Sequence, residues 1–238
     1  LTDGLIESGV RRIGAEQELF LVDDRWRPAP VATEALERLE ESCFTTELGR
    51  FNLEINLEPI RLEGRCFSAL EEQLSERVMR ARAAARAIGV EVALTGILPT
   101  LVEADLELAN MSPVPRYFAL NEATSRLRGD DYEFYIRGVD ELRLRHPNIM
   151  LEACNTSFQV HLQVDPETFA HRYNVAQAIA GPVLAAAVNS PLLFGRRLWA
   201  ETRIPLFQQS VDTRSPALAL RERNPRVSFG RQWIADSV

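Results

Sequence analysis

Three short segments of the sequence carry polar side chains at every second position. Glu16 and Glu18 form the first such pair. Glu54 and Glu58 form the second, and Glu47 lies a short distance upstream of them. Because successive side chains of a β-strand point to opposite faces, each pair would lie on one face of its own strand. The alternation predicts two strands whose polar faces are acidic.

The third segment, residues 157–163, adds an imidazole to this pattern. Gln159, His161 and Gln163 occupy alternate positions, and apolar residues fill the positions between them. If the three segments join one sheet, their polar rows form a wall of carboxylates with one imidazole, backed by an apolar layer. Two simpler interpretations stay open: each row is an ordinary solvent-facing side of its strand, and His161 is a structural core residue.

The chemistry that suits such a wall is the binding of a divalent cation. Carboxylates held close together repel one another unless a cation neutralises them. Oxygen ligands with one imidazole suit Mg²⁺ or Mn²⁺, and Mg²⁺ commonly bridges protein carboxylates to nucleotide phosphates. The sequence therefore favours a metal site that could also hold a nucleotide.

A nucleotide would need a binding device other than a glycine-rich loop. The sequence has no G-x-x-x-x-G-K-[ST] loop, no G-x-G-x-x-G turn and no Ser-His-Asp order. Arginine forks match the geometry of phosphate and carboxylate groups. The last part of the chain is rich in them: Arg196, Arg197, Arg203, Arg214, Arg221 and Arg223. The alternative for any one of these arginines is an ordinary basic surface.

Composition narrows the class of protein. The chain has 238 residues, 26% of them charged, and a net charge of -7, which argues against nucleic acid as a partner. Its three cysteines show no paired or ligand-like spacing, as in a reduced, cytoplasmic protein. The chain starts without Met and stops within what resembles a new element. We therefore expect residues 1–238 to be a portion of one catalytic domain, with the remainder after residue 238.

Hydrophobic periodicity predicts a mixed order of elements. Strands are expected at 11–22, 50–60, 90–96 and 157–164, an extended segment at 131–144, and loops over 189–214. Helices are expected at 33–43, 68–88, 112–127 and from 166 to about 189. The apolar stretch 176–194 contains Gly, Pro and Asn, which favours a buried core helix over a membrane span. This irregular order favours an α+β fold with an antiparallel sheet.

Five motifs, in a fixed order, resemble those of the glutamate–cysteine ligases and the wider glutamine synthetase-like fold. Residues 14–20 are similar to the family's G-x-E-x-E strand, and residues 47–59 to its second acidic strand. Residues 115–117 resemble its P-x-R-Y element, and residues 156–164 its T-x-x-Q-V-x strand. Residues 189–214 resemble its N-S-P-x-x-x-G run with the arginines that follow.

The resemblance implies a fold, a reaction and a set of site residues. The fold is a mostly antiparallel catalytic sheet of the glutamine synthetase-like type, flanked by helices. The reaction joins the glutamate side-chain carboxylate to the amine of cysteine through an acyl phosphate, with ATP and Mg²⁺ or Mn²⁺, as in glutathione biosynthesis. The implied metal ligands are Glu16, Glu18, Glu47, Glu54 and His161. The implied nucleotide contacts are His161 and Arg203, and the implied catalytic residues are Glu54, Arg203 and Arg214.

Several alternatives remain open. The family's later strand, which supplies another metal-binding Glu, has no match before Val238, and cysteine as the amine substrate rests on the resemblance alone. The chain could instead join glutamate to a different amine. It could also be a regulatory relative that binds a nucleotide or an amino acid without turnover, or a structural domain with solvated acidic rows. A homo-oligomer is compatible with the sequence, and no membrane partner is expected.

Overall fold

The computed structural model describes residues 7–214, 225, 227–230 and 232–236 of the chain. Its largest sheet has six strands, and every pairing between them is antiparallel. The strands are β1 (Arg12–Val22), β2 (Phe44–Thr46), β3 (Asn52–Asn56), β4 (Ile60–Arg61), β5 (Glu91–Ala93) and β8 (Phe158–Leu162). The prediction of an α+β fold with a mostly antiparallel sheet is confirmed.

Strand β1 is the centre of this sheet because it pairs on both of its edges. Glu16 faces Asn56 of β3 on one edge and Gln159 of β8 on the other. The strand predicted over 50–60 is in fact two strands, which is a correction. Pro59 has no backbone N–H for the ladder, so β3 ends before it, and Ile60 then pairs with Ile13 of β1.

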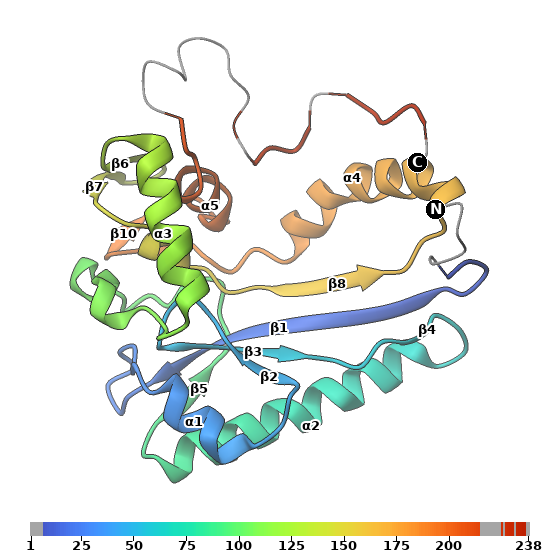
Figure 1. The fold of residues 1–238 in the computed structure, drawn as a ribbon, viewed down its shortest axis with the longest axis horizontal. Coiled ribbons are helices and arrows are strands. Elements are labelled where there is room, and N and C mark those ends of the chain that lie inside the picture. The colour runs from blue at the N-terminus through green and yellow to red at the C-terminus, as the bar shows by residue number, and fades with distance from the viewer. Residues whose placement is uncertain (1–6, 215–224, 226, 231, 237–238) are drawn as a thin grey trace.

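Two helices cover one face of the sheet. They are α1 (Ala32–Leu39) and α2 (Cys66–Ala87), and Figure 1 shows both below the strands. Leu19 and Leu53 are completely buried in the core between this face and the helices. The predicted helix over 33–43 is too long, because Glu40 adopts a left-handed conformation with φ of 50° and ends α1.

A second core lies at the end of the sheet where β1 finishes. Phe20 is stacked on Phe51 there, with ring centroids 6.3 Å apart, and both rings are buried. Other elements pack around this core: α3 (Pro115–Arg128), β6 (Tyr132–Arg137), β7 (Glu141–His146), η3 (Ile149–Cys154) and α5 (Arg203–Ser210). Short elements connect them: η1 (Glu103–Leu106), η2 (Leu108–Asn110), β9 (Leu192–Leu193) and β10 (Arg196–Arg197).

Two predicted segments in this part of the chain differ from the structure. The extended segment predicted over 131–144 is a hairpin that turns at Gly138, where a Cβ atom would collide with the backbone of Leu198. The region predicted as loops over 189–214 contains α5 and the β9–β10 ribbon. A helix of eight residues with Pro205 in its first turn gives too weak a periodic signal to be recognised in advance.

The apolar stretch near residue 180 forms a helix, but that helix is not buried. After η4 (Pro166–Thr168), α4 (Phe169–Ala186) lies on the opposite side of the strands from α1 and α2 (Figure 1). Its one buried residue is Ala170, whereas Ile179 is 53% exposed. The prediction of a helix is therefore confirmed, whereas the prediction that this helix is buried is wrong. None of the helices in the described part of the chain is long and apolar enough to cross a membrane.

We expect the core between the sheet and its helices to dominate stability. Leu19→Ala should lower the free energy of unfolding by about 3 kcal/mol, because it leaves a cavity between β1 and the helices. Leu127→Ala is the matched control, since Leu127 on α3 is 69% exposed and should cost less than about 0.5 kcal/mol. Urea unfolding measures both, and equal losses would contradict this assignment of the core.

Candidate metal centre

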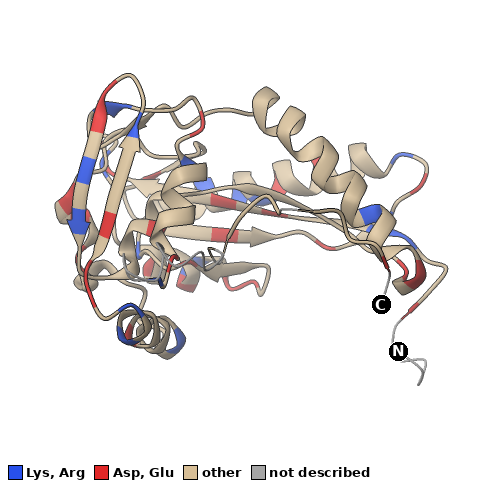
Figure 2. Ribbon diagram, turned by 90° about the horizontal axis from the view of Figure 1, so that it is seen from above, with Lys and Arg blue, Asp and Glu red and all other residues tan. Residues whose placement is uncertain are grey.

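Three of the predicted metal ligands come together on the open face of the sheet. Glu18 of β1 lies directly opposite Glu54 of β3, and Glu47 lies in the turn between β2 and β3. One carboxylate oxygen from each lies within 4.8 Å of the other two. Strand alternation explains this, because the neighbours Leu19, Leu53 and Ile55 point to the helix-covered face (Figure 2 shows acidic positions on the central strands).

Hydrogen bonds from the surrounding strands orient two of these carboxylates. The Ser157 backbone N–H donates to Glu18 Oε2 at 2.7 Å, and the Gln159 amide donates to Glu18 Oε1 at 3.3 Å. Asn56 donates to Glu54 Oε1 at 2.7 Å. Glu18 is thus held by residues in and just before the neighbouring strand β8, and Glu54 by a residue of its own strand, which is the kind of support that a preorganised cation site requires.

Burial makes Glu18 and Glu47 costly to ionise. Desolvation, followed by a hydrogen bond with Glu54, raises the pKa of Glu47 well above its usual range. Desolvation also raises the pKa of Glu18, although the Ser157 N–H opposes this shift. A divalent cation would stabilise the ionised forms, and an all-oxygen donor set suits Mg²⁺ or Mn²⁺. Glu18, Glu47 and Glu54 therefore fit such an ion.

The other two predicted ligands form a separate pair on the same face. Glu16 Oε1 lies 3.6 Å from His161 Nε2, where His161 is on the neighbouring strand β8. Neither residue belongs to the group formed by Glu18, Glu47 and Glu54. The structure thus divides the predicted five-residue set into a compact group of three and an adjacent pair. The roles of Glu16 and His161 in metal or nucleotide binding stay predictions.

Glu152 is an acidic residue that the sequence analysis missed. It lies on η3, half-buried beside the carboxylate group, and desolvation together with the charge of Glu18 raises its pKa to about 7. Strand periodicity could not find it because it is not on a strand. The available signal was a single charged residue inside the otherwise apolar run Ile149–Cys154. Buried, unpaired charge in such a run often marks a functional position.

Arg203 forms an ion pair and a hydrogen bond within the protein. Its guanidinium group forms a two-point ion pair with buried Glu201, at 2.6 Å for each contact. It also donates to the carbonyl of Thr156 at 2.8 Å, and the next residue, Ser157, binds Glu18. Gly96 permits this packing, since a Cβ there would lie 2.9 Å from Arg203 Nε. Arg203 is therefore a positioning residue for Glu18, and its predicted substrate contact remains untested.

The other predicted arginines lie in different surroundings. Arg214 forms a two-point ion pair with Asp212, and Arg128 donates to the carbonyls of both residues. Its catalytic role stays a prediction. Arg197 pairs with Asp140, whose pKa this contact holds at about 2. Two further candidates, Arg221 and Arg223, lie outside the described residues.

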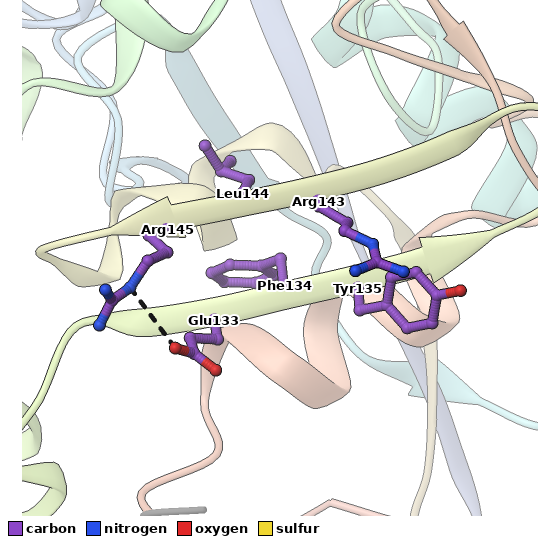
Figure 3. A pocket seen from close by; sticks show the side chains of 6 residues that line it. All are labelled: Glu133, Phe134, Tyr135, Arg143, Leu144 and Arg145. Carbon is purple, nitrogen blue, oxygen red and sulfur yellow. Dashed lines mark ion pairs between the residues drawn. The ribbon is translucent and has the colours of Figure 1, made fainter.

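A depression of about 540 Å³ lies on the β6–β7 hairpin and does not contain any of these groups. Figure 3 shows that its lining comes from the two neighbouring strands. Arg145 forms an ion pair with Glu133 at 3.4 Å, and Arg143 lies over the ring of Tyr135. Its cations are already paired, so this surface offers no free group for a reaction.

A cation should bind at the three-carboxylate group and depend on Glu54. We expect Glu54→Gln to weaken Mn²⁺ binding at least tenfold, because it removes one charged ligand from the group. Glu58→Gln is the matched control, since Glu58 lies beyond the end of β3 and is exposed. Isothermal titration with Mn²⁺ measures both affinities. Equal affinity in the two variants would rule out this assignment.

The stability of the metal-free protein should depend on pH through Glu152. Its folded-state pKa of about 7 lies above the usual value of 4.5, so the folded protein binds the proton more tightly than the unfolded chain. This contribution to stability is therefore lost as pH rises from about 4.5 to 7. Glu152→Gln should be more stable than wild type at about pH 8, with a smaller difference at about pH 5.

Urea unfolding in EDTA at the two pH values measures this difference. Glu122→Gln serves as control, because Glu122 is an exposed residue of α3. A stability difference for Glu152→Gln that does not change with pH would contradict the shifted pKa.

One family of known proteins matches most of the chain. The family model described as glutamate-cysteine ligase family 2 (GCS2) matches residues 12–230, which include every strand of the main sheet and all three carboxylates. No curated protein matches the chain. The matched family is one of ligase-type enzymes resembling glutamate–cysteine ligase. A match over this much of the sequence shows that the chain belongs to glutamate-cysteine ligase family 2.

Proposed function

We propose that the protein is an ATP-dependent ligase that joins the side-chain carboxylate of glutamate to an amine. Cysteine, the amine in the family's name, is the first substrate to test, and a different amine is the alternative. The observation that supports a catalytic role is the group formed by Glu18, Glu47 and Glu54, with oxygens within 4.8 Å of one another. A domain whose acidic rows were merely solvated would spread its charges apart.

The proposed reaction proceeds in two transfers. A glutamate side-chain oxygen attacks the γ-phosphorus of ATP, the bond to the β-phosphate oxygen breaks, and ADP leaves. The nitrogen of the amine then attacks the acyl carbon, phosphate leaves, and the nitrogen loses a proton as the amide forms. Neither transfer requires a covalent bond to the enzyme.

The residues of the chain contribute orientation and charge. Glu18, Glu47 and Glu54 would hold Mg²⁺ or Mn²⁺, which would neutralise charge on the transferring phosphoryl group. Ser157 and Asn56 keep the carboxylates of Glu18 and Glu54 in place. Arg203 fixes the strand segment that carries Ser157. Such preorganised electrostatics are the main means by which phosphoryl-transfer enzymes act.

The decisive assay is the release of phosphate from ATP that depends on both Mg²⁺ and glutamate. It is run with cysteine and with a panel of other amines, and the products are identified by mass. We expect Glu54→Gln to reduce turnover at least 100-fold without unfolding the protein, because the phosphoryl transfer loses part of its cation site. Glu58→Gln should retain activity within about twofold.

Each outcome of that assay has a distinct meaning. Cysteine-dependent formation of the γ-glutamyl dipeptide supports the namesake reaction, and turnover with another amine changes only the acceptor. ATP binding without turnover by any amine favours a regulatory relative. Full activity in Glu54→Gln would sink the proposed role of the carboxylate group.

A further inference from the structure

A pocket of about 250 Å³ adjoins the carboxylate group and is distinct from it. Its walls come from α3, η3, α5 and the turn before β3. Glu47 lines this pocket and also belongs to the three-carboxylate group, so the two spaces share one wall. A molecule in the pocket would therefore lie next to the proposed site of phosphoryl transfer.

The free polar atoms that face this pocket are hydrogen-bond acceptors. The Tyr117 hydroxyl donates its proton to the Thr46 carbonyl at 2.9 Å, and the Thr124 hydroxyl donates to a carbonyl of its own helix at 2.8 Å. The Ser210 hydroxyl likewise donates within α5 at 3.0 Å. With these protons committed, a ligand in the pocket must donate hydrogen bonds rather than accept them.

Glu152 supplies the strongest of these acceptors. Its side chain lines the pocket, and among the described residues it has no hydrogen-bond or ion-pair partner for its carboxylate. A desolvated carboxylate without a partner is costly, and an ammonium group, which carries a positive charge and three donors, would compensate for that cost. No Lys or Arg is among the described residues that line the pocket, so these residues offer an anion no counter-charge.

The remaining walls are apolar and close together. Leu120, Ile149 and Phe207 line the space around the two acidic residues. The volume lies just below the range of about 300 to 1,000 Å³ that is usual for ligand pockets. An occupant must therefore be small, with a cationic end and a short hydrocarbon body.

We propose that this pocket is the acceptor subsite of the ligase, built for a small primary amine that has an apolar body and no carboxylate within the pocket, with Glu152 binding its ammonium group. The proposal rests on the ligase function proposed above and specifies the chemical class of its second substrate. Arg116, next to Tyr117 in the sequence, is exposed and donates to the Tyr117 hydroxyl, and it is not among the residues that line the pocket. An amino acid acceptor would have to place its carboxylate outside this space.

Matched pairs of acceptors test the predicted selectivity. Cysteamine is cysteine without its carboxylate, and ethylamine is related to alanine in the same way. We expect kcat/KM to be at least tenfold higher for the amine of each pair than for the amino acid. Higher kcat/KM for cysteine than for cysteamine would overturn the proposal.

Variants of the pocket test the role of Glu152. Glu152→Gln should raise the KM for the preferred amine at least tenfold, and more than it raises the KM for glutamate or ATP. Glu122→Gln is the control on exposed α3. Leu120→Phe, at a position that is 43% exposed, should narrow the pocket and raise KM more for butylamine than for ethylamine. Equal effects of Glu152→Gln on all three substrates would contradict the assignment.

A separate readout distinguishes failure of this proposal from failure of the ligase function. Hydroxylamine traps an acyl phosphate as a hydroxamate, so its formation from glutamate and ATP reports the first transfer alone. Absence of hydroxamate would refute the ligase function. In that case, propylamine binding by isothermal titration still decides the subsite: wild type should bind at least tenfold more tightly than Glu152→Gln, and equal affinity would refute it.

Discussion

The central constraint on this structure is the cost of holding three carboxylates close together at partly buried positions on one face of the sheet. Glu18 and Glu54 face each other because β1 and β3 pair in one particular register, and a shift of β3 by one residue would turn Glu54 to the apolar face. The raised pKa values of Glu18 and Glu47 show that this arrangement opposes ionisation. Two packed cores, one beneath the sheet and one at its end, maintain the register against this opposition.

The central part of the site could be predicted from the sequence because alternate side chains of a strand point to the same face of the sheet. Two strands with acidic residues at every second position, and apolar residues between them, have one stable orientation in a half-buried sheet. Glu18 and Glu54 followed from this rule. Glu152 did not, because it lies on a short 3₁₀ helix whose position is determined by packing between distant elements. The β6–β7 hairpin and α5 were missed for a related reason, since their signals are short.

Residue type alone did not predict which side chains are buried or which contacts they form. The apolar character of α4 and of the outward residues of β8, such as Val160, suggested burial, yet Val160 is 52% exposed. An apolar side chain is more stable when it is buried, but it is buried only where another element packs against it in the folded structure. Arg203 is a second example, which concerns contacts rather than burial. Its guanidinium group pairs with Glu201 and donates to a backbone carbonyl, contacts that the sequence alone does not show, and its predicted contact with substrate or phosphate stays a prediction.

The contacts between Ser157 and Glu18 have a consequence for how this sequence can change over time. Ser157 uses its backbone N–H to bind the Glu18 carboxylate, and its carbonyl accepts the Glu18 N–H at 2.9 Å. Both are contacts of the backbone, and the Ser157 side chain adds a further hydrogen bond to the Glu18 carboxylate. Insertions or deletions between Thr156 and β8 would break both contacts at once. The number of residues between Thr156 and β8 is therefore constrained by the carboxylate group itself, in addition to any constraint on the residue type at position 157.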